Sequence, residues 1–161
     1  MESNQIEQRL AHLFQAWAGR SVEQVLPLAP SGSPRIYYRL KAGERTAIGT
    51  YNADQAENEA FLSFSRHFKA KGLPVPNIYA ENLSAHIYLQ EDLGDERLYD
   101  RLPEPGQPFP ETLAGLYKRV VEELARLQIQ GGQGLDYSKC TPREVFDEQA
   151  MLWDFYAFKY Q

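Results

Sequence analysis

The chain has 161 residues, of which 43% are hydrophobic and 12% aromatic, and its 17 Lys and Arg residues against 22 Asp and Glu residues give a net charge of −5. The apolar content excludes a disordered chain, no apolar run reaches the ~20 residues that cross a bilayer, and the acidic balance disfavours nucleic acid as a partner. We therefore expect no membrane and no nucleic acid among its partners. The polar N-terminus, which carries no secretory signal, and the single Cys140 favour a cytoplasmic protein.

The first predicted element is an amphipathic helix over residues 4–18, within an N-terminal unit of residues 1–19. Its apolar positions recur at three- and four-residue steps, as on one face of a helix. They are Ile6, Leu10, Leu13, Phe14 and Trp17. A short β-like run over residues 22–28 and a cluster of turn residues at 29–34 follow.

Two strands joined by a hairpin are predicted over residues 35–41 and 45–51. Successive side chains of a strand point to opposite faces of the sheet. Arg35 and Arg39 should therefore share one face, and Leu40 should lie on the other.

A long helix is predicted from its cap, Asp54, to about Lys71, with Glu57 in an acidic first turn. Three phenylalanines share one face of this helix, namely Phe61, Phe64 and Phe68. Two further strands are expected over residues 77–81 and 86–91.

The composition changes after residue 95. A proline-rich connector leads into a predicted helix over residues 111–130, and Pro142 is expected to open a last helix. This last region is rich in aromatic residues, namely Phe146, Trp153, Phe155, Tyr156, Phe158 and Tyr160. We therefore expect an α+β unit over residues 20–95, with a five-stranded antiparallel sheet and one long helix, and an all-helical segment over residues 96–161.

Five sequence motifs follow one another in these elements. In chain order they are Ser31-Gly-Ser-Pro-Arg-Ile-Tyr-Tyr-Arg39, Glu57-Asn-Glu-Ala-Phe-Leu62, Gly72-Leu-Pro-Val-Pro76, Ile78-Tyr-Ala-Glu81 and Tyr88-Leu-Gln-Glu-Asp-Leu-Gly94. Their order resembles the aminoglycoside phosphotransferase and choline kinase-like family, whose fold is that of the protein kinases. They are most similar to the sugar kinases of cell-wall recycling, which phosphorylate the anomeric hydroxyl of N-acetylmuramate or N-acetylglucosamine.

The resemblance covers about residues 20–130. It implies a kinase-like small lobe over residues 20–95 that ends in a hinge, followed over residues 96–161 by the first helices of an incomplete large lobe. It also implies ATP and Mg²⁺ as cofactors of the complete enzyme, and a sugar or aminosugar as its substrate.

The catalytic residues of such kinases are missing from this sequence. The family uses an H-x-D-x-x-x-x-N-like loop and a later metal-binding Asp. None of the three histidines, His12, His67 and His86, is followed two residues later by Asp. The chain therefore looks like the N-terminal part of such a kinase, with no catalytic residue and no metal ligand of its own, and we expect this part by itself to be inactive.

The phosphates of a nucleotide would lie under the turn of Ser31, Gly32 and Ser33. Small residues leave backbone N–H groups free to point at anionic oxygens. An ordinary β-turn is the alternative interpretation.

The strand over residues 46–50 corresponds to the kinase strand that carries a phosphate-binding lysine, and Gly49 stands at the lysine position. Arg35 or Arg39 could supply the positive charge instead, because a guanidinium binds phosphate in a bidentate manner. Alternatively, both are solvated charges on a strand.

Glu57 is the expected counterpart of the kinase helix glutamate, with Glu59 as second choice. A carboxylate that only stabilises the first turn of the helix is the alternative for Glu57.

The hinge is expected at residues 90–94, where the backbone would read adenine. The resemblance implies that the Gln90 carbonyl accepts from the adenine amino group, that the Asp92 N–H donates to a ring nitrogen, and that Leu89 stands at the back of the pocket. A simple strand end is the alternative.

Asp154, among the aromatic residues of the last helix, is a candidate sugar-binding carboxylate. The alternative is that this aromatic run belongs to a core that a missing part of the large lobe completes. In that case we expect exposed aromatic surface and self-association.

Two other function classes remain open for the whole chain. A pseudokinase-like module that binds a nucleotide or another ligand is compatible with the glycine at position 49. A structural interaction domain is the other, because a fold does not by itself specify a function.

Overall fold

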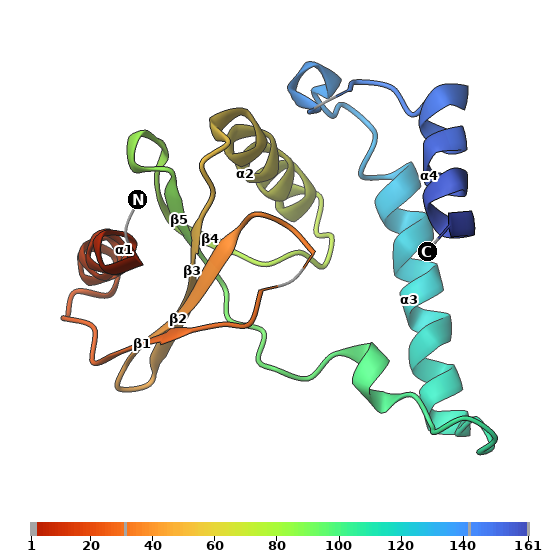
Figure 1. The fold of residues 1–161 in the computed structure, drawn as a ribbon, viewed down its shortest axis with the longest axis horizontal. Coiled ribbons are helices and arrows are strands. Elements are labelled where there is room, and N and C mark those ends of the chain that lie inside the picture. The colour runs from red at the N-terminus through yellow and green to blue at the C-terminus, as the bar shows by residue number, and fades with distance from the viewer. Residues whose placement is uncertain (1–2, 31, 142, 161) are drawn as a thin grey trace.

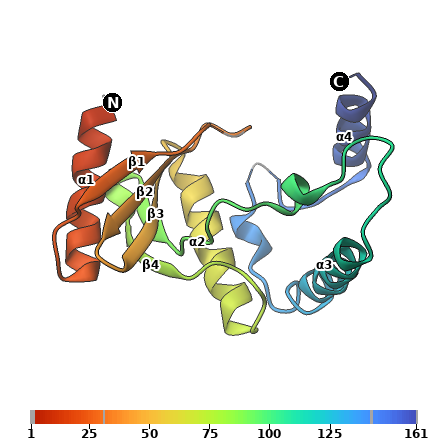
Figure 2. The same ribbon diagram turned by 90° about the horizontal axis from the view of Figure 1, so that it is seen from below.

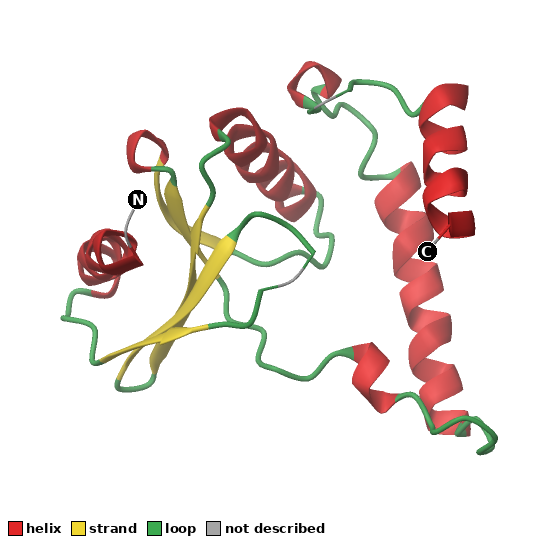
Figure 3. Cartoon of the chain, viewed as in Figure 1, coloured by secondary structure: helices red, strands yellow, loops and turns green. Residues whose placement is uncertain are grey.

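The computed structural model describes residues 3–30, 32–141 and 143–160 (Figures 1 and 3). Its helices and strands, in chain order, are α1 (Ser3–Ala18), β1 (Gln24–Pro27), β2 (Ile36–Ala42), β3 (Arg45–Tyr51), α2 (Gln55–Ala70), β4 (Ile78–Asn82), β5 (Ile87–Gln90), α3 (Glu111–Ile129) and α4 (Glu148–Tyr160). The predicted α+β class, with five antiparallel strands in one sheet, is confirmed.

The sheet has the strand order β1-β2-β3-β5-β4. Its register places Gly49 of β3 opposite Leu89 of β5, and Ile48 opposite Gln90. In β2 the burial alternates as predicted, because Leu40 is fully buried whereas Arg39 is only partly so. The alternation gives the sheet two chemically different faces.

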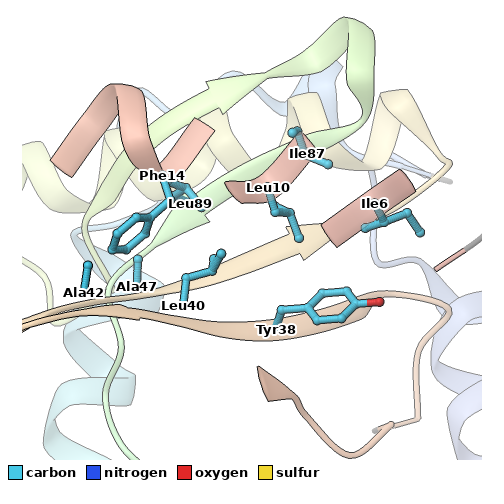
Figure 4. Close-up of a cluster of buried hydrophobic side chains, with 9 residues drawn as sticks. All are labelled: Ile6, Leu10, Phe14, Tyr38, Leu40, Ala42, Ala47, Ile87 and Leu89. Carbon is cyan, nitrogen blue, oxygen red and sulfur yellow. The ribbon is translucent and has the colours of Figure 1, made fainter. Parts of the chain in front are cut away.

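Helix α1 covers one face of the sheet and forms the main core with it (Figure 4). Its apolar stripe consists of Ile6, Leu10 and Phe14, all at most 1% exposed. The sheet residues that pack against this stripe are Tyr38, Leu40, Ala42, Ala47, Ile87 and Leu89. The helical spacing of the apolar residues therefore predicted correctly which side of α1 is buried.

Helix α2 lies on the other face of the sheet (Figures 1 and 2). As predicted, Asp54 caps it, and the Asp54 carboxylate accepts from the Glu57 N–H at 3.0 Å. The Phe61 ring stacks on the Tyr88 ring of β5, with 5.2 Å between centroids. The most deeply buried side chains of the helix are Asn58 and Leu62, so the phenylalanine face is only half-buried.

The last helix begins later than the sequence predicts. Pro142 lies outside the described residues, and residues 143–147 are not helical, so Phe146 precedes α4. The reason is local capping, because the Asp147 carboxylate accepts from the Ala150 N–H at 3.0 Å. The side chains of α4 up to residue 159 are exposed, apart from that of Ala150, which is partly buried.

The helical segment contacts the sheet unit through α2. The Nε2 atom of His67 lies 2.8 Å from the carbonyl oxygen of Gly131, just after α3. In the views of Figures 1 and 2, α4 lies at the far side of the molecule from α1. Among the helices of the described residues, none is both long enough and apolar enough to cross a membrane.

Candidate functional site

The sheet face toward α2 carries two rows of side chains that run across three strands. One row is Arg39, Ile48 and Gln90, and the next is Tyr37, Thr50 and Tyr88. Thr50 and Tyr88 are buried, at 0% and 1% exposed. Burial is the largest influence on the Tyr88 hydroxyl and raises its pKa to about 12, whereas the positive charge of Arg35 acts in the opposite direction. This face is therefore polar and largely dry where it meets α2.

Arg35 and Glu57 form an ion pair above this face. A guanidinium nitrogen of Arg35 lies 2.8 Å from the Glu57 carboxylate, and the Arg35 guanidinium also lies 5.5 Å from the centre of the Phe61 ring. The second oxygen of Glu57 accepts from the Asn52 side-chain amide at 2.7 Å. Glu57 is thus fixed by two partners from different strand ends and is more than a first-turn carboxylate.

One donor of Arg35 has no acceptor. Its Nε atom is buried and makes no hydrogen bond within the described part of the chain. Buried donors are nearly always paired, and the missing partner of such a donor is commonly an ordered water molecule, an ion or a ligand oxygen. A guanidinium with an open donor is suited to an anionic oxygen.

The small-residue turn lies directly before Arg35. Gly32 and Ser33 are part of a bend that leads into β2, whereas Ser31 lies outside the described residues. A side-chain carbon placed on Gly32 would meet no atom within 4 Å, so the space beside the turn is open. Gly32 and Ser33 thus immediately precede, in the chain, the segment that carries Arg35 of the Arg35–Glu57 pair.

Arg39 is engaged by the segment after β5. Its Nε atom donates to Asp92 at 2.7 Å, a terminal nitrogen donates to the other Asp92 oxygen at 3.0 Å, and the remaining nitrogen lies 2.8 Å from Asp95. Burial alone would raise the pKa of Asp92, but the hydrogen bonds from Arg39 and from the Gly94 N–H bring it below its ordinary value. Both arginines considered for phosphate thus have carboxylate partners, but all three nitrogens of Arg39 are engaged, whereas the Nε atom of Arg35 is not.

Two positions taken from the resemblance lie on the wrong face of the sheet. Leu89 is fully buried in the core under α1, so it does not stand behind a site on the α2 face. A side chain at Gly49 would also point there, because its first carbon would lie 2.6 Å from Leu40 and 2.9 Å from Leu10. The strand period of two places Ile48, and not Gly49, on the α2 face.

Near the end of β5 lie one atom that the sequence analysis named, the Asp92 N–H, and one that it did not, the side-chain oxygen of Gln90. Gln90 is on the α2 face, and its side-chain oxygen is buried without a hydrogen-bond partner among the described residues. The Asp92 N–H likewise has no partner in that part of the chain. The sequence analysis did not name Asn52 or Tyr88 as site residues. Tyr88 follows from the alternation of side chains in β5 once Leu89 is known to face α1.

Asp154 lies apart from these residues, on α4. It lines an open hollow of about 620 Å³, together with Tyr137, Phe146 and Trp153. Trp153 is 78% exposed, so the hollow is shallow on that side. No contact described in the structure joins Asp154 to Arg35 or Glu57.

Neither similarity to known proteins nor a metal site assigns this chain to a family. No family model matches the sequence, and no curated protein matches it. Within residues 3–30, 32–141 and 143–160, no group of three or more His, Cys, Asp or Glu side chains is arranged to hold a metal ion.

Proposed function

We propose that residues 20–95 are the nucleotide-binding small lobe of an ATP-dependent phosphotransferase that acts on a hydroxyl of a sugar or aminosugar. The observation that carries the proposal is the Arg35–Glu57 ion pair, which lies beside a small-residue turn and leaves one buried arginine donor open. In kinases a lysine–glutamate pair performs this task. Here the cation comes from the strand that follows the turn.

ATP, when bound, supplies the phosphoryl group; the chain's own residues hold it. The backbone of Gly32 and Ser33 would face the phosphates, and the open Nε of Arg35 would donate to a phosphate oxygen. Glu57 keeps the Arg35 side chain oriented, and Asn52 keeps Glu57 oriented. The unpaired Asp92 N–H is available to a ring nitrogen of the base.

Binding of a nucleotide is only one part of phosphoryl transfer. Phosphoryl transfer needs a residue that orients the attacking hydroxyl and carboxylates that hold Mg²⁺. The described residues contain neither an H-x-D loop nor a metal-binding cluster. We therefore expect weak nucleotide binding and no turnover from these residues alone, and we assign turnover to a longer protein that contains them.

Nuclear magnetic resonance titration of the isotope-labelled chain tests the binding step. Mg-ATP should shift the amide signals of Gly32, Ser33 and Leu93, and Arg35→Met should weaken ATP binding about tenfold while it leaves adenosine binding unchanged. Arg9→Met, on the exposed side of α1, is the matched control. Absence of any shift with ATP would contradict the proposal.

Phosphotransfer is tested on the product of the complete reading frame. ADP release is followed with N-acetylmuramate, N-acetylglucosamine and an aminoglycoside, in parallel with the 161-residue chain. We expect turnover with one of the two sugars, only by the longer product, and Glu57→Gln should reduce it. Turnover by the 161-residue chain would show that the catalytic residues lie elsewhere than proposed.

A second candidate function has its own support. The exposed apolar side chains of α4, with Trp153 at 78% and Phe158 at 86% exposed, favour an interaction domain.

The pseudokinase-like alternative is favoured by a different result. In that case the chain binds ATP in the titration, but the longer product phosphorylates none of the three substrates.

A further inference from the structure

We infer that Arg39 is a positioning residue that holds the segment after β5 and thereby orients the Asp92 N–H toward the base of a nucleotide. The inference rests on the proposed function. We call the three side chains Arg39, Asp92 and Asp95 the hinge clasp. The sequence suggested a phosphate-binding role for Arg39, and the clasp gives it a different one.

The geometry of the clasp is that of a specific, oriented ion pair. Two nitrogens of Arg39 donate to the two oxygens of Asp92, at 2.7 and 3.0 Å. The side chains are largely buried, with only 11% of Arg39 and 8% of Asp92 exposed. Exposed ion pairs contribute little, whereas a buried two-point arginine–carboxylate contact fixes both direction and distance.

The clasp acts on the backbone through Asp92. One Asp92 oxygen, besides its contact with Arg39, accepts from the Gly94 N–H at 3.0 Å. The carboxylate therefore joins β2 to a local turn over residues 92–94. Since the side chain is held at both points, the direction of the Asp92 N–H is fixed as well. No backbone or side-chain acceptor for this N–H is found among the described residues, so it can donate to solvent or to a ligand.

Arg39 and Arg35 differ in how many of their guanidinium nitrogens have an acceptor. All three guanidinium nitrogens of Arg39 contact carboxylates of Asp92 or Asp95. A phosphate would have to displace these contacts. Arg35 instead keeps a buried Nε without a partner. The structure thus assigns the phosphate to Arg35 and the orientation of the hinge to Arg39.

The test compares adenosine with Mg-ATP by nuclear magnetic resonance titration of the full 161-residue chain. Arg39→Met and Asp92→Asn should weaken binding of both ligands by the same factor, about tenfold, because they disturb recognition of the base that both share. The affinity of Arg39→Lys for both ligands should lie between that of these variants and that of the unaltered chain. Amide exchange at Leu93 and Gly94 should become faster in the Met and Asn variants, with or without ligand.

Arg97→Met is the matched control. It removes an arginine–aspartate pair of the same type, with Asp100, but the Arg97 side chain is 75% exposed. It should change neither the affinity for the two ligands nor the amide exchange at residues 93 and 94.

Two results would overturn the clasp. One is that Arg39→Met loses ATP binding but retains adenosine binding, which would make Arg39 a phosphate ligand. The other is that Arg39→Met and Asp92→Asn leave the adenosine affinity unchanged. No binding of either ligand to the unaltered chain would instead overturn the proposed function, and the nucleotide role of the clasp with it.

Discussion

The side chain of His67 and the backbone of Gly131 meet across 64 positions of the sequence, with the His67 Nε2 atom 2.8 Å from the Gly131 carbonyl oxygen. Since a carbonyl only accepts, the imidazole donates this hydrogen bond. Helix α2, which carries Glu57, is thereby joined to the segment that follows α3. The orientation of the helical part relative to α2 depends in part on this contact.

The substitution His67→Phe should loosen the end of α3. It removes one partly buried hydrogen bond, which is worth about 1 kcal/mol, so amide exchange at Gln130 and Gly131 should accelerate about fivefold. Exchange in α1 should be unchanged. His12→Phe, at an exposed position of α1, is the control and should not affect Gln130 or Gly131. Equal exchange rates in both variants would show that the contact does not hold the two parts together.

Two glycine-to-alanine substitutions should have opposite effects on stability. At Gly49 the new carbon would lie 2.6 Å from Leu40 and 2.9 Å from Leu10, so the core under α1 must shift and Gly49→Ala should cost about 1–3 kcal/mol of unfolding free energy. At Gly115, in α3, a new carbon would meet nothing within 4 Å. Gly115→Ala should therefore stabilise α3 by about 0.5–1 kcal/mol. Urea unfolding followed by circular dichroism measures both.

Gly49→Lys tests the face of this position directly. If the position faced α2, a lysine there would place a positive charge on the polar face of the sheet and would be tolerated. We expect instead a loss of folding, because the lysine would enter the apolar core with Leu10 and Leu40. A folded Gly49→Lys variant with increased ATP affinity would contradict the observed register.

The buried hydroxyl of Tyr88 should make the protein sensitive to alkali. Burial raises its pKa to about 12, above the value of about 10 in an unfolded chain. A raised pKa contributes stability that is complete below pH 10 and is lost as the pH rises toward 12, in total on the order of 2–3 kcal/mol. The unfolding free energy of Tyr88→Phe should therefore fall less between pH 9 and pH 12 than that of the unaltered chain. Parallel curves for the two proteins would contradict the assignment.

The 161-residue chain should self-associate through α4. Trp153 and Phe158 are 78% and 86% exposed, and neighbouring apolar residues of the helix are exposed too. Sedimentation equilibrium should show dimers or larger species, and the double substitution of Trp153 and Phe158 by Gln should reduce them. Tyr99→Gln, at a position 72% exposed outside the helix, should not. A monomer at all concentrations would contradict this prediction.

The elements of the fold could be predicted from local sequence because their causes are local. The apolar residues of α1 recur with the helical period, Asp54 supplies a cap, and the alternation around Leu40 is that of a strand with one buried face. Where a local signal was misleading, as at Pro142, another local cap at Asp147 set the start of the helix.

The site could be predicted only in part, because the face of a strand residue depends on what covers each face. In β5 the residues Ile87, Tyr88 and Leu89 are all buried, so no alternation of polarity identifies the inner side. The packing of α1 decides it, and it places Leu89 and Gly49 in the core and Tyr88 and Gln90 toward α2.

Local sequence was sufficient to predict most of the helices and strands, the antiparallel sheet and two arginines near a small-residue turn. The partners of these arginines became evident only from the packed structure. Arg39 and Asp92 are 53 positions apart, and Arg35 and Glu57 lie in different elements, so neither pair has a local sequence signal. The partner of a charged side chain is set by which elements pack together, and this depends on the burial of apolar faces far from the charges themselves.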